Sequence, residues 1–237
     1  SDSLFQDNQS SDDGAGIATD EDSTTTIILE NTDFDNNDTG DNGGALYVKK
    51  GTLDITGGTF QNNDADDDGG VIAVDSSSGN DVDITITGGT YSNNTAGDDG
   101  AVIDKDGDGT LTVDGATFDG NTAGVTDTEG DGGAINTEGG ETNIDNSTFI
   151  NNTGDNGGAV YAENDGTEVT LTDSTATDNT SGGIGDNLGA NNNGIIYVIG
   201  GDVDVDETTD ENGGGDIVIP FSTPKEAIVD TDVDPTN

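Results

Sequence analysis

The phrase Thr59-Phe60-Gln61-Asn62-Asn63 decides the fold, because it returns as Thr90-Tyr91-Ser92-Asn93-Asn94 and, in shorter form, along most of the chain. Its constant part is an aromatic residue followed three positions later by asparagine. The copies are Phe5/Asn8, Phe34/Asn37, Phe60/Asn63, Tyr91/Asn94, Phe118/Asn121, Phe149/Asn152 and, without the ring, Ala176/Asn179. Successive copies lie 29, 26, 31, 27, 31 and 27 residues apart. A period near 30 is typical of a solenoid.

Each repeat contains two further strand-like segments, separated by turns rich in Gly, Asp and Asn. The first follows a glycine pair or its remnant, as in Gly44-Ala45-Leu46, and we expect its last copy at Gly194-Ile195-Ile196. The second alternates aliphatic residues with Thr or Asp, as in Val82/Ile84/Ile86, and we expect it to end at Val203/Val205. Alternation with period 2 places the aliphatic residues on one face of a strand. Three strands per repeat predict an all-β chain, a single parallel β-helix of about seven coils.

In a parallel β-helix, equivalent residues of successive coils stack at about 4.8 Å. The rings of the repeated phrase should therefore form an aromatic ladder, and its seven asparagines should form a ladder of side-chain amides. Three other aromatic residues share one position, three residues after the glycine of the first strand, at Tyr47, Tyr161 and Tyr197.

The prolines place a boundary near the C-terminus. All three of them, Pro220, Pro224 and Pro235, follow residue 219. Proline removes a backbone donor that a laddered strand needs. We therefore expect residues 1–219 to form the β-helix and residues 220–237 to form a tail of different character.

The repeated Gly-Gly-Ala-[Ile/Val/Leu] and Phe-x-x-Asn phrases resemble the repeat of polymorphic outer-membrane proteins, chlamydial-type surface adhesins and autotransporter passengers. The resemblance covers residues 4–179 and implies a right-handed parallel β-helix exposed at a cell surface, with adhesion as the usual role. The chain departs from the family in its extreme acidity, and we expect no C-terminal barrel domain within these residues.

The charge of the chain restricts its partners. The sequence has 51 acidic residues, four lysines and no arginine, for a formal net charge of −47. Such a charge repels nucleic acid and anionic lipid, and no apolar run is long enough to span a membrane. The composition resembles that of proteins from extreme halophiles. Two agents could offset the self-repulsion, high monovalent salt or bound calcium, and we favour salt.

The residue types present argue against catalysis. The chain has no histidine, cysteine or arginine, so Ser-His and Cys-His nucleophilic arrangements are excluded. A pair of carboxylates could still serve a glycosidase, but among 51 acids two neighbours carry little information. We therefore expect a protein that is not an enzyme and requires no cofactor.

Two kinds of modification or ligand site are suggested by local patterns. Asp104, Asp106 and Asp108 precede Gly109 with the spacing of the front half of an EF-hand-type calcium loop, although Gly115 stands where a bidentate acid belongs. Sequons for N-glycosylation occur at six asparagines, of which three are ladder positions. The remaining three, Asn93, Asn146 and Asn151, are the candidates for carrying a sugar.

The ends of the repeat array suggest self-association. The N-terminus opens almost directly on a third-strand phrase, Leu4-Phe5, with no room for a cap, whereas solenoids normally need polar caps. At the C-terminal end, the last clear strand is the second strand at Val203/Val205, so a neighbouring subunit that begins with a third strand would continue the repeat. Alternatively, Asp216-Ile217-Val218-Ile219 supplies that third strand within the same chain. The tail could cap its own end or reach the next subunit as an added strand. The residues expected to carry this contact are Leu4, Phe5, Ile217, Ile219, Phe221, Ile228 and Val229.

These patterns together favour an extracellular, non-enzymatic structural protein that assembles head to tail into a filament or surface layer, a homopolymer joined through the β-helix ends. The first alternative is a monomeric cell-surface adhesin or carbohydrate-binding stalk that contacts a surface glycan or host. The second alternative is a polysaccharide-active β-helix enzyme.

Overall fold

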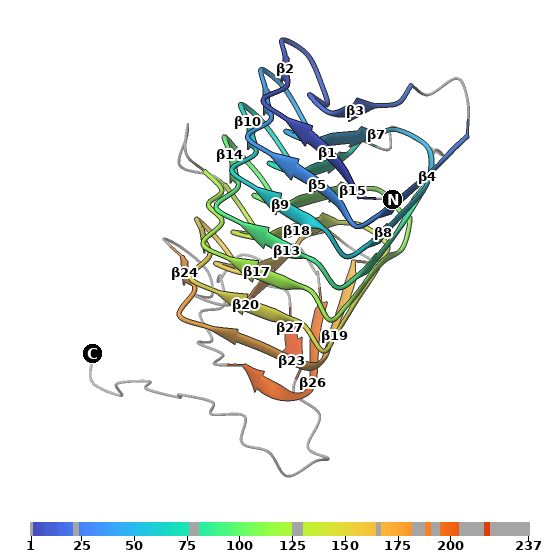
Figure 1. The fold of residues 1–237 in the computed structure, drawn as a ribbon. Coiled ribbons are helices and arrows are strands. Elements are labelled where there is room, and N and C mark those ends of the chain that lie inside the picture. Colours follow the sequence, from blue (N-terminus) through green and yellow to red (C-terminus); the bar gives the residue numbers. More distant parts are fainter. Residues whose placement is uncertain are drawn as a thin grey trace.

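The structure is a computed structural model that describes residues 2–20, 24–75, 81–124, 130–164 and 167–181, and the backbone of 188–190, 195–203 and 216–218. Every secondary-structure element within these residues is a β-strand, and all the strand pairs are parallel. The chain winds into a solenoid of about six turns, close to the seven expected (Figure 1). The predicted parallel β-helix of the right-handed type is therefore confirmed.

Strands of the same kind stack on one another from coil to coil. The first strands of the coils form one seven-stranded sheet, made of β3 (Ile17–Ala18), β7 (Leu46–Val48), β11 (Ile72–Val74), β15 (Ile103–Asp106), β18 (Ile135–Glu138), β22 (Val160–Ala162) and β25 (Leu188–Ala190). The second strands are β4 (Thr25–Glu30), β8 (Gly51–Thr56), β12 (Val82–Thr87), β16 (Leu111–Asp114), β19 (Glu141–Asp145), the start of β23 (Glu168–Thr177), the start of β26 (Ile195–Val203) and β27 (Asp216–Val218).

The third strands carry the repeated phrase. They are β1 (Ser3–Gln6), β5 (Thr32–Asp35), β9 (Thr59–Gln61), β13 (Thr90–Ser92), β17 (Thr117–Asp119), β20 (Thr148–Ile150) and the end of β23. Six of the seven ladder asparagines are followed by a fourth, very short strand that the sequence did not reveal, and Asn121 is followed by an isolated bridge at Thr122. These short strands are β2 (Gln9–Ser10), β6 (Asp38–Thr39), β10 (Asp64–Ala65), β14 (Thr95–Ala96), β21 (Thr153–Gly154) and β24 (Thr180–Ser181).

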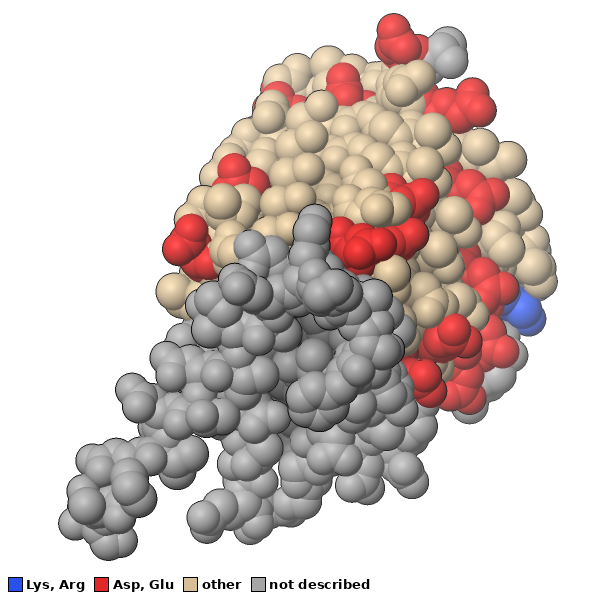
Figure 2. Space-filling view, turned by 90° about the horizontal axis from the view of Figure 1, so that it is seen from below, with Lys and Arg blue, Asp and Glu red and all other residues tan. Residues whose placement is uncertain are grey.

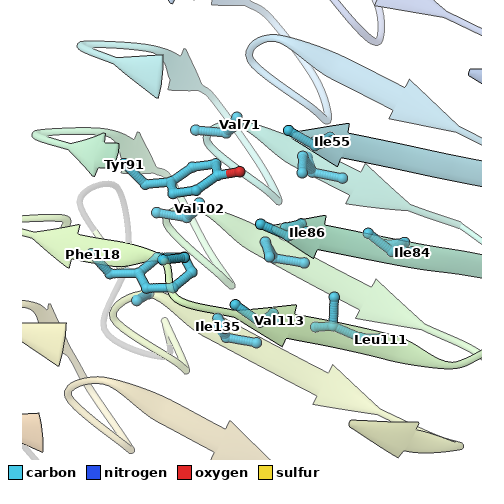
Figure 3. Close-up of a cluster of buried hydrophobic side chains, with 14 of the residues drawn as sticks. Ile55, Val71, Ile84, Ile86, Tyr91, Val102, Leu111, Val113, Phe118 and Ile135 are labelled. Carbon is cyan, nitrogen blue, oxygen red and sulfur yellow. The ribbon is translucent and has the colours of Figure 1, made fainter. Parts of the chain in front are cut away.

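The core of the solenoid is filled by the inward members of each strand. Ile84 and Ile86 of β12 are buried between their neighbours on β8 and β16, while Thr85 between them is exposed. Figure 3 shows these aliphatic side chains arranged in layers, with Tyr91 and Phe118 closing one side. The period-2 alternation in the sequence thus corresponds to the inside and outside of the coil.

The predicted aromatic ladder is formed. Six rings stack in sequence order with centroid separations of 4.6 to 5.2 Å and interplanar angles of 1 to 15°. The ladder ends at Ala176, which pairs with Phe149 but has no ring. The ring positions therefore fix the register of all the coils that contain them.

The predicted asparagine ladder is also formed, and it runs in one direction. The side-chain amide of each member donates to the Oδ1 of the next, as Asn94 does to Asn121 at 3.0 Å, and also donates to a backbone carbonyl one coil back, here that of Phe60 at 3.0 Å. The same two bonds recur from Asn37 to Asn152. These amides are fully buried, so each contributes most to stability when all its partners are present.

The left-handed backbone at the corners falls mainly on the residue before the ladder asparagine. Asn36, Asn62, Asn93 and Asn151 all have φ between 53 and 56°, a conformation that asparagine tolerates better than most residues. The glycine pairs satisfy a different need: at Gly69, with φ of 63°, a Cβ would lie 2.3 Å from the carbonyl oxygen of Ile72. Only glycine fits that turn without displacing backbone.

The predicted register near the C-terminal end is wrong. Ile195 and Ile196 pair with Glu168 and Val169, so this segment is a second strand, whereas β25 at Leu188–Ala190 provides the first strand of that coil. Tyr197 therefore does not share the position of Tyr47 and Tyr161. Val203 pairs with Ala176 and stands at the ring position of the third strand. The prediction was wrong because first and second strands are both aliphatic and cannot be told apart by that pattern. The glycine pair Gly200-Gly201, which marks the corner before a third strand, indicates the register correctly.

The expected boundary between residues 219 and 220 lies outside the described residues, as does the whole tail.

Candidate functional site

The first coil carries large hydrophobic side chains that are exposed to solvent. Leu4 on β1 is 59% exposed and Ile28 on β4 is 64% exposed, and these are the exposed large hydrophobic side chains of the described part. Phe5 stacks on Phe34 at 4.6 Å and remains half-buried, and Ile17 and Ile27 are only partly buried. We call Leu4, Phe5, Ile17, Ile27 and Ile28 the open end.

The exposed side chains of the open end interrupt polar columns. Leu4 pairs with Asp33, and the equivalent position is threonine from Thr59 to Thr175 and aspartate at Asp202. Ile28 pairs with Asp54, which pairs with Thr85, and the column continues through Thr112. Leu4 was predicted from the sequence, but Ile28 was missed. The polar residues in register with Ile28, Asp54 and Thr85, could have indicated that its side chain faces solvent.

The other predicted assembly residues lie toward the C-terminal end. Ile217 is on β27 and pairs with Ile196, so the segment does add a strand internally, but on the second strand of the preceding coil and not as the third strand. Ile219, Phe221, Ile228 and Val229 lie outside the described residues.

An acidic column runs beside the glycine turns. Its members precede the glycine pair of each coil and are Asp13, Asn42, Asp68, Asp99, Asp131 and Asn156. A side-chain oxygen of one member accepts a hydrogen bond from the backbone N–H of the next. Asp68 accepts from the N–H of Asp99 at 3.1 Å, and Asp99 accepts from the N–H of Asp131 at 2.6 Å. The same type of hydrogen bond therefore joins each turn to the next. Either a carboxylate or an amide oxygen can be its acceptor.

Burial raises the pKa values of three carboxyl groups in this column, those of Asp68, Asp99 and Asp131. Desolvation, with repulsion from neighbouring acids, raises the pKa of Asp99 to about 8 and that of Asp131 to about 7, despite the bonds that each accepts. The pKa of Asp68 is raised for the same reasons. Figure 2 shows how densely acidic side chains gather along one margin of the molecule, with little basic surface to offset them.

The predicted calcium residues lie next to this column but do not converge. Asp104 and Asp106 are on β15 and Asp108 follows in the turn. Asp104 is buried, accepts a hydrogen bond from the Asn136 amide at 2.9 Å, and has a raised pKa because of desolvation and nearby acids. No three acidic side chains in the described part of the chain lie close enough to hold one metal ion. Calcium binding by these residues stays a prediction.

Two buried polar groups in the core were not predicted. Lys105 is fully buried in a column that holds Val74 and Thr137 in the adjacent coils, and its Nζ donates to the carbonyl oxygens of Gly107, at 2.9 Å, and Gly139. Desolvation lowers the pKa of Lys105 to about 8. The hydroxyl of Tyr91 is buried and has no hydrogen-bond partner among the residues that the structure describes. The pairing of these residues with buried residues in the adjacent coils would have been enough to place both side chains in the interior of the solenoid.

The three predicted glycosylation residues are all exposed at corners of the coil. Asn93, Asn146 and Asn151 have left-handed φ values of 53, 49 and 56°. By contrast, the sequon asparagines Asn37 and Asn179 are buried in the amide ladder.

The described geometry defines a class, the solenoid proteins built from a stacked β-helical repeat. Within that class, residues 115–138 and 146–163 match the family model of the Chlamydia polymorphic membrane protein repeat, which confirms the resemblance drawn from the Phe-x-x-Asn and Gly-Gly-Ala phrases. That family consists of surface-associated, generally non-enzymatic proteins. The comparisons with curated proteins and with solved structures found no match. The described residues include no helix with the length and apolarity needed to cross a membrane.

Proposed function

We propose that this chain is an extracellular, non-enzymatic structural protein whose β-helices stack head to tail into a filament or surface layer. The observation that supports this most is the open end. Its two exposed aliphatic side chains stand where the equivalent residues of the following coils are polar, as far as Thr175 for Leu4 and Thr170 for Ile28, and a surface of this kind marks an interaction site.

Three features of the open end favour a second β-helix as the partner. Within the described part, β1 pairs with β5 alone and β4 with β8 alone, so each keeps one edge of backbone donors and acceptors for another parallel strand. The ring of Phe5 is the first of the aromatic ladder. Asn8 donates to the Oδ1 of Asn37 at 2.7 Å, while its own Oδ1 accepts no hydrogen bond within the described part of the chain. A second copy would satisfy the strand edges with the parallel pairing that already joins its coils, whereas the ring position of its last described third strand is Val203, so Phe5 would meet an aliphatic residue there.

The test compares two substitutions that flank the same carboxylate. Ile28 and Thr85 both pair with Asp54 from opposite sides, so Ile28→Asp and Thr85→Asp introduce the same charge beside the same neighbour. We expect electron microscopy and sedimentation in high salt to show filaments for the wild type and Thr85→Asp, and monomers for Ile28→Asp with unchanged circular dichroism. Monomeric wild-type protein at micromolar concentration would overturn the proposal.

Residues 220–237 offer a second, separate test. Deleting them should abolish assembly if the tail joins the next subunit. If the tail instead covers its own end, the deletion should leave assembly intact and lower the melting temperature.

The alternative of a monomeric adhesin is favoured by a different feature, an open polar groove of about 210 Å³ at the corner of the first three coils. Amide and carboxylate side chains line it, and both can bond sugar hydroxyl groups. The lining residues are Asp7, Gln9, Asn36, Asn37, Asp38, Asn62 and Asp64. Glycan binding that is lost in Asn62→Ala, with filaments absent, would support this alternative.

A further inference from the structure

The six sequons of the chain fall into two structural sets. Asn8, Asn37 and Asn179 belong to the amide ladder. The amide of Asn37 donates to Asn63 at 2.8 Å and to the carbonyl of Phe5 at 3.2 Å, and the residue has no exposed surface. A sugar on its Nδ2 would have no room and would break the ladder. Folding is therefore incompatible with modification of Asn37, and the same holds for Asn179, which is buried and donates to the carbonyl of Phe149 at 3.1 Å.

Asn93, Asn146 and Asn151 form the second set, at the outer corners of the coils. A residue with left-handed φ at such a corner lies outside the laddered strands, so a bulky group on its side chain need not disturb strand pairing. Asn93 and Asn151 occupy the same corner, two coils apart, since Tyr91 pairs with Phe118 and Phe118 with Phe149. Their separation along the axis is about 10 Å.

The amides of this set differ in what they contact. Asn146 donates to the carboxylate of Asp114, and Asn151 to that of Asp119, both at 3.1 Å. The Asn93 side chain makes no hydrogen bond within the described part of the chain. The next coil has Gly120 at the same corner, where a Cβ would lie 3.2 Å from Asn93 Oδ1. The missing side chain at residue 120 thus leaves space beside Asn93 in the direction of Asn151.

We propose that Asn93 is an N-glycosylation site, that Asn151 and Asn146 are secondary sites, and that the buried ladder sequons Asn37 and Asn179 stay unmodified. The donor class is an oligosaccharide linked through phosphate to a lipid. The Asn93 Nδ2 forms a bond to the anomeric carbon of the first sugar, the bond from that carbon to the phosphate oxygen breaks, the lipid phosphate leaves, and the amide gives up one proton. The reaction involves no redox change, and the modified amide keeps one N–H.

The experiment is peptide mass spectrometry of the chain secreted through an N-glycosylating pathway. Enzymatic release of glycans in heavy-oxygen water converts each modified asparagine into a labelled aspartate and so reports occupancy at every sequon. We expect the highest occupancy at Asn93 and none at Asn37 or Asn179. Asn93→Gln should remove that glycan and leave the peptide containing Asn37 unchanged.

Two results would overturn the proposal. One is an unmodified Asn93 in protein whose host glycosylates a co-expressed sequon reporter. The other is occupancy at Asn37 or Asn179 equal to that at Asn93, which would show that the folded structure does not sort the sequons. Neither result depends on whether the chain forms filaments, because occupancy is measured on single chains.

Discussion

Tyr91 contributes its ring to the aromatic ladder but carries a hydroxyl that the core does not satisfy. A buried polar group without a partner costs about 1–3 kcal/mol. We therefore expect Tyr91→Phe to raise the free energy of unfolding by about 1–2 kcal/mol in denaturant titrations.

The matched control for this substitution is Tyr47→Phe. The hydroxyl of Tyr47 donates to Asp75 at 3.0 Å, so its removal should leave stability unchanged or lower it slightly. Equal effects of the two substitutions would contradict the account of Tyr91.

The buried carboxyl groups predict that stability depends on pH. The pKa values of Asp99 and Asp131 rise from 3.8 to about 8 and about 7 on folding. Between pH 4 and pH 8 the unfolded chain therefore binds fewer protons than the folded one, and stability falls as pH rises. We expect the melting temperature, measured by circular dichroism in metal-free buffer, to be higher at pH 5 than at pH 8.

Asn42 and Asn156 show that an amide is accepted in the same column. Asp99→Asn should therefore keep the bond to the Asp131 N–H, raise the melting temperature at pH 8 and flatten the pH profile. An unchanged profile would mean that other groups control it.

Lys105 predicts an effect of opposite sign at alkaline pH. Its folded pKa of about 8 lies below the value of 10.5 for the free side chain, so the unfolded chain binds more protons between these values. The wild type should gain stability relative to Lys105→Met as pH rises from 8 to about 10. Denaturant titrations at several pH values would measure this difference, and a constant difference would place the amine in contact with solvent.

At the scale of strands and ladders, the asparagine ladder should be cooperative. Asn121 accepts from both the backbone and the side chain of Asn94, and donates to Asn152 and to the Tyr91 carbonyl. Asn121→Ala leaves several buried groups without partners, and we expect a loss of about 2–4 kcal/mol in the free energy of unfolding.

Asn143→Ala is the control for the ladder, because Asn143 bonds only the exposed side chain of Glu141 among the described residues. That variant should lie within about 0.5 kcal/mol of the wild type. Similar losses in both variants would show that burial in the ladder has no special role.

The elements differ in how well the sequence specified them. The third strands could be predicted because a ring and an asparagine at fixed spacing have one place in a coil. The strand at 195–203 was misplaced because Ile195-Ile196 satisfies the pattern of either aliphatic strand. The short strands after six of the ladder asparagines carry only two residues and no apolar alternation, so no periodic signal existed. In the candidate site, Leu4 was predicted from its position, whereas the exposure of Ile28 and the burial of Lys105 depend on register between coils.

At the scale of the whole molecule, the net charge of −47 should make stability depend on salt. The screening length falls from about 10 Å at 0.1 M to about 3 Å at 1 M salt, so repulsion between neighbouring coils is screened at high salt. We expect the melting temperature to rise steadily with sodium chloride up to molar concentrations.

An uncharged osmolyte at equal osmolality is the control, because it is excluded from the protein surface but does not screen charge. It should raise the melting temperature less than sodium chloride does. Calcium at millimolar concentration, in low salt, tests the other remedy for the charge. A melting temperature that responds to calcium and not to sodium chloride would favour bound cations over screening.

The parallel stacking of coils also makes length an adjustable property. Each coil touches chiefly the one before and the one after it, and the contacts at the junctions are alike as far as Phe149 for the rings and Asn179 for the amides. Loss or duplication of one repeat by unequal recombination would therefore recreate the same junctions, provided that the cut falls at equivalent positions. A gene of this kind can change the length of the β-helix that it encodes in increments of about 4.8 Å, without inventing a new fold.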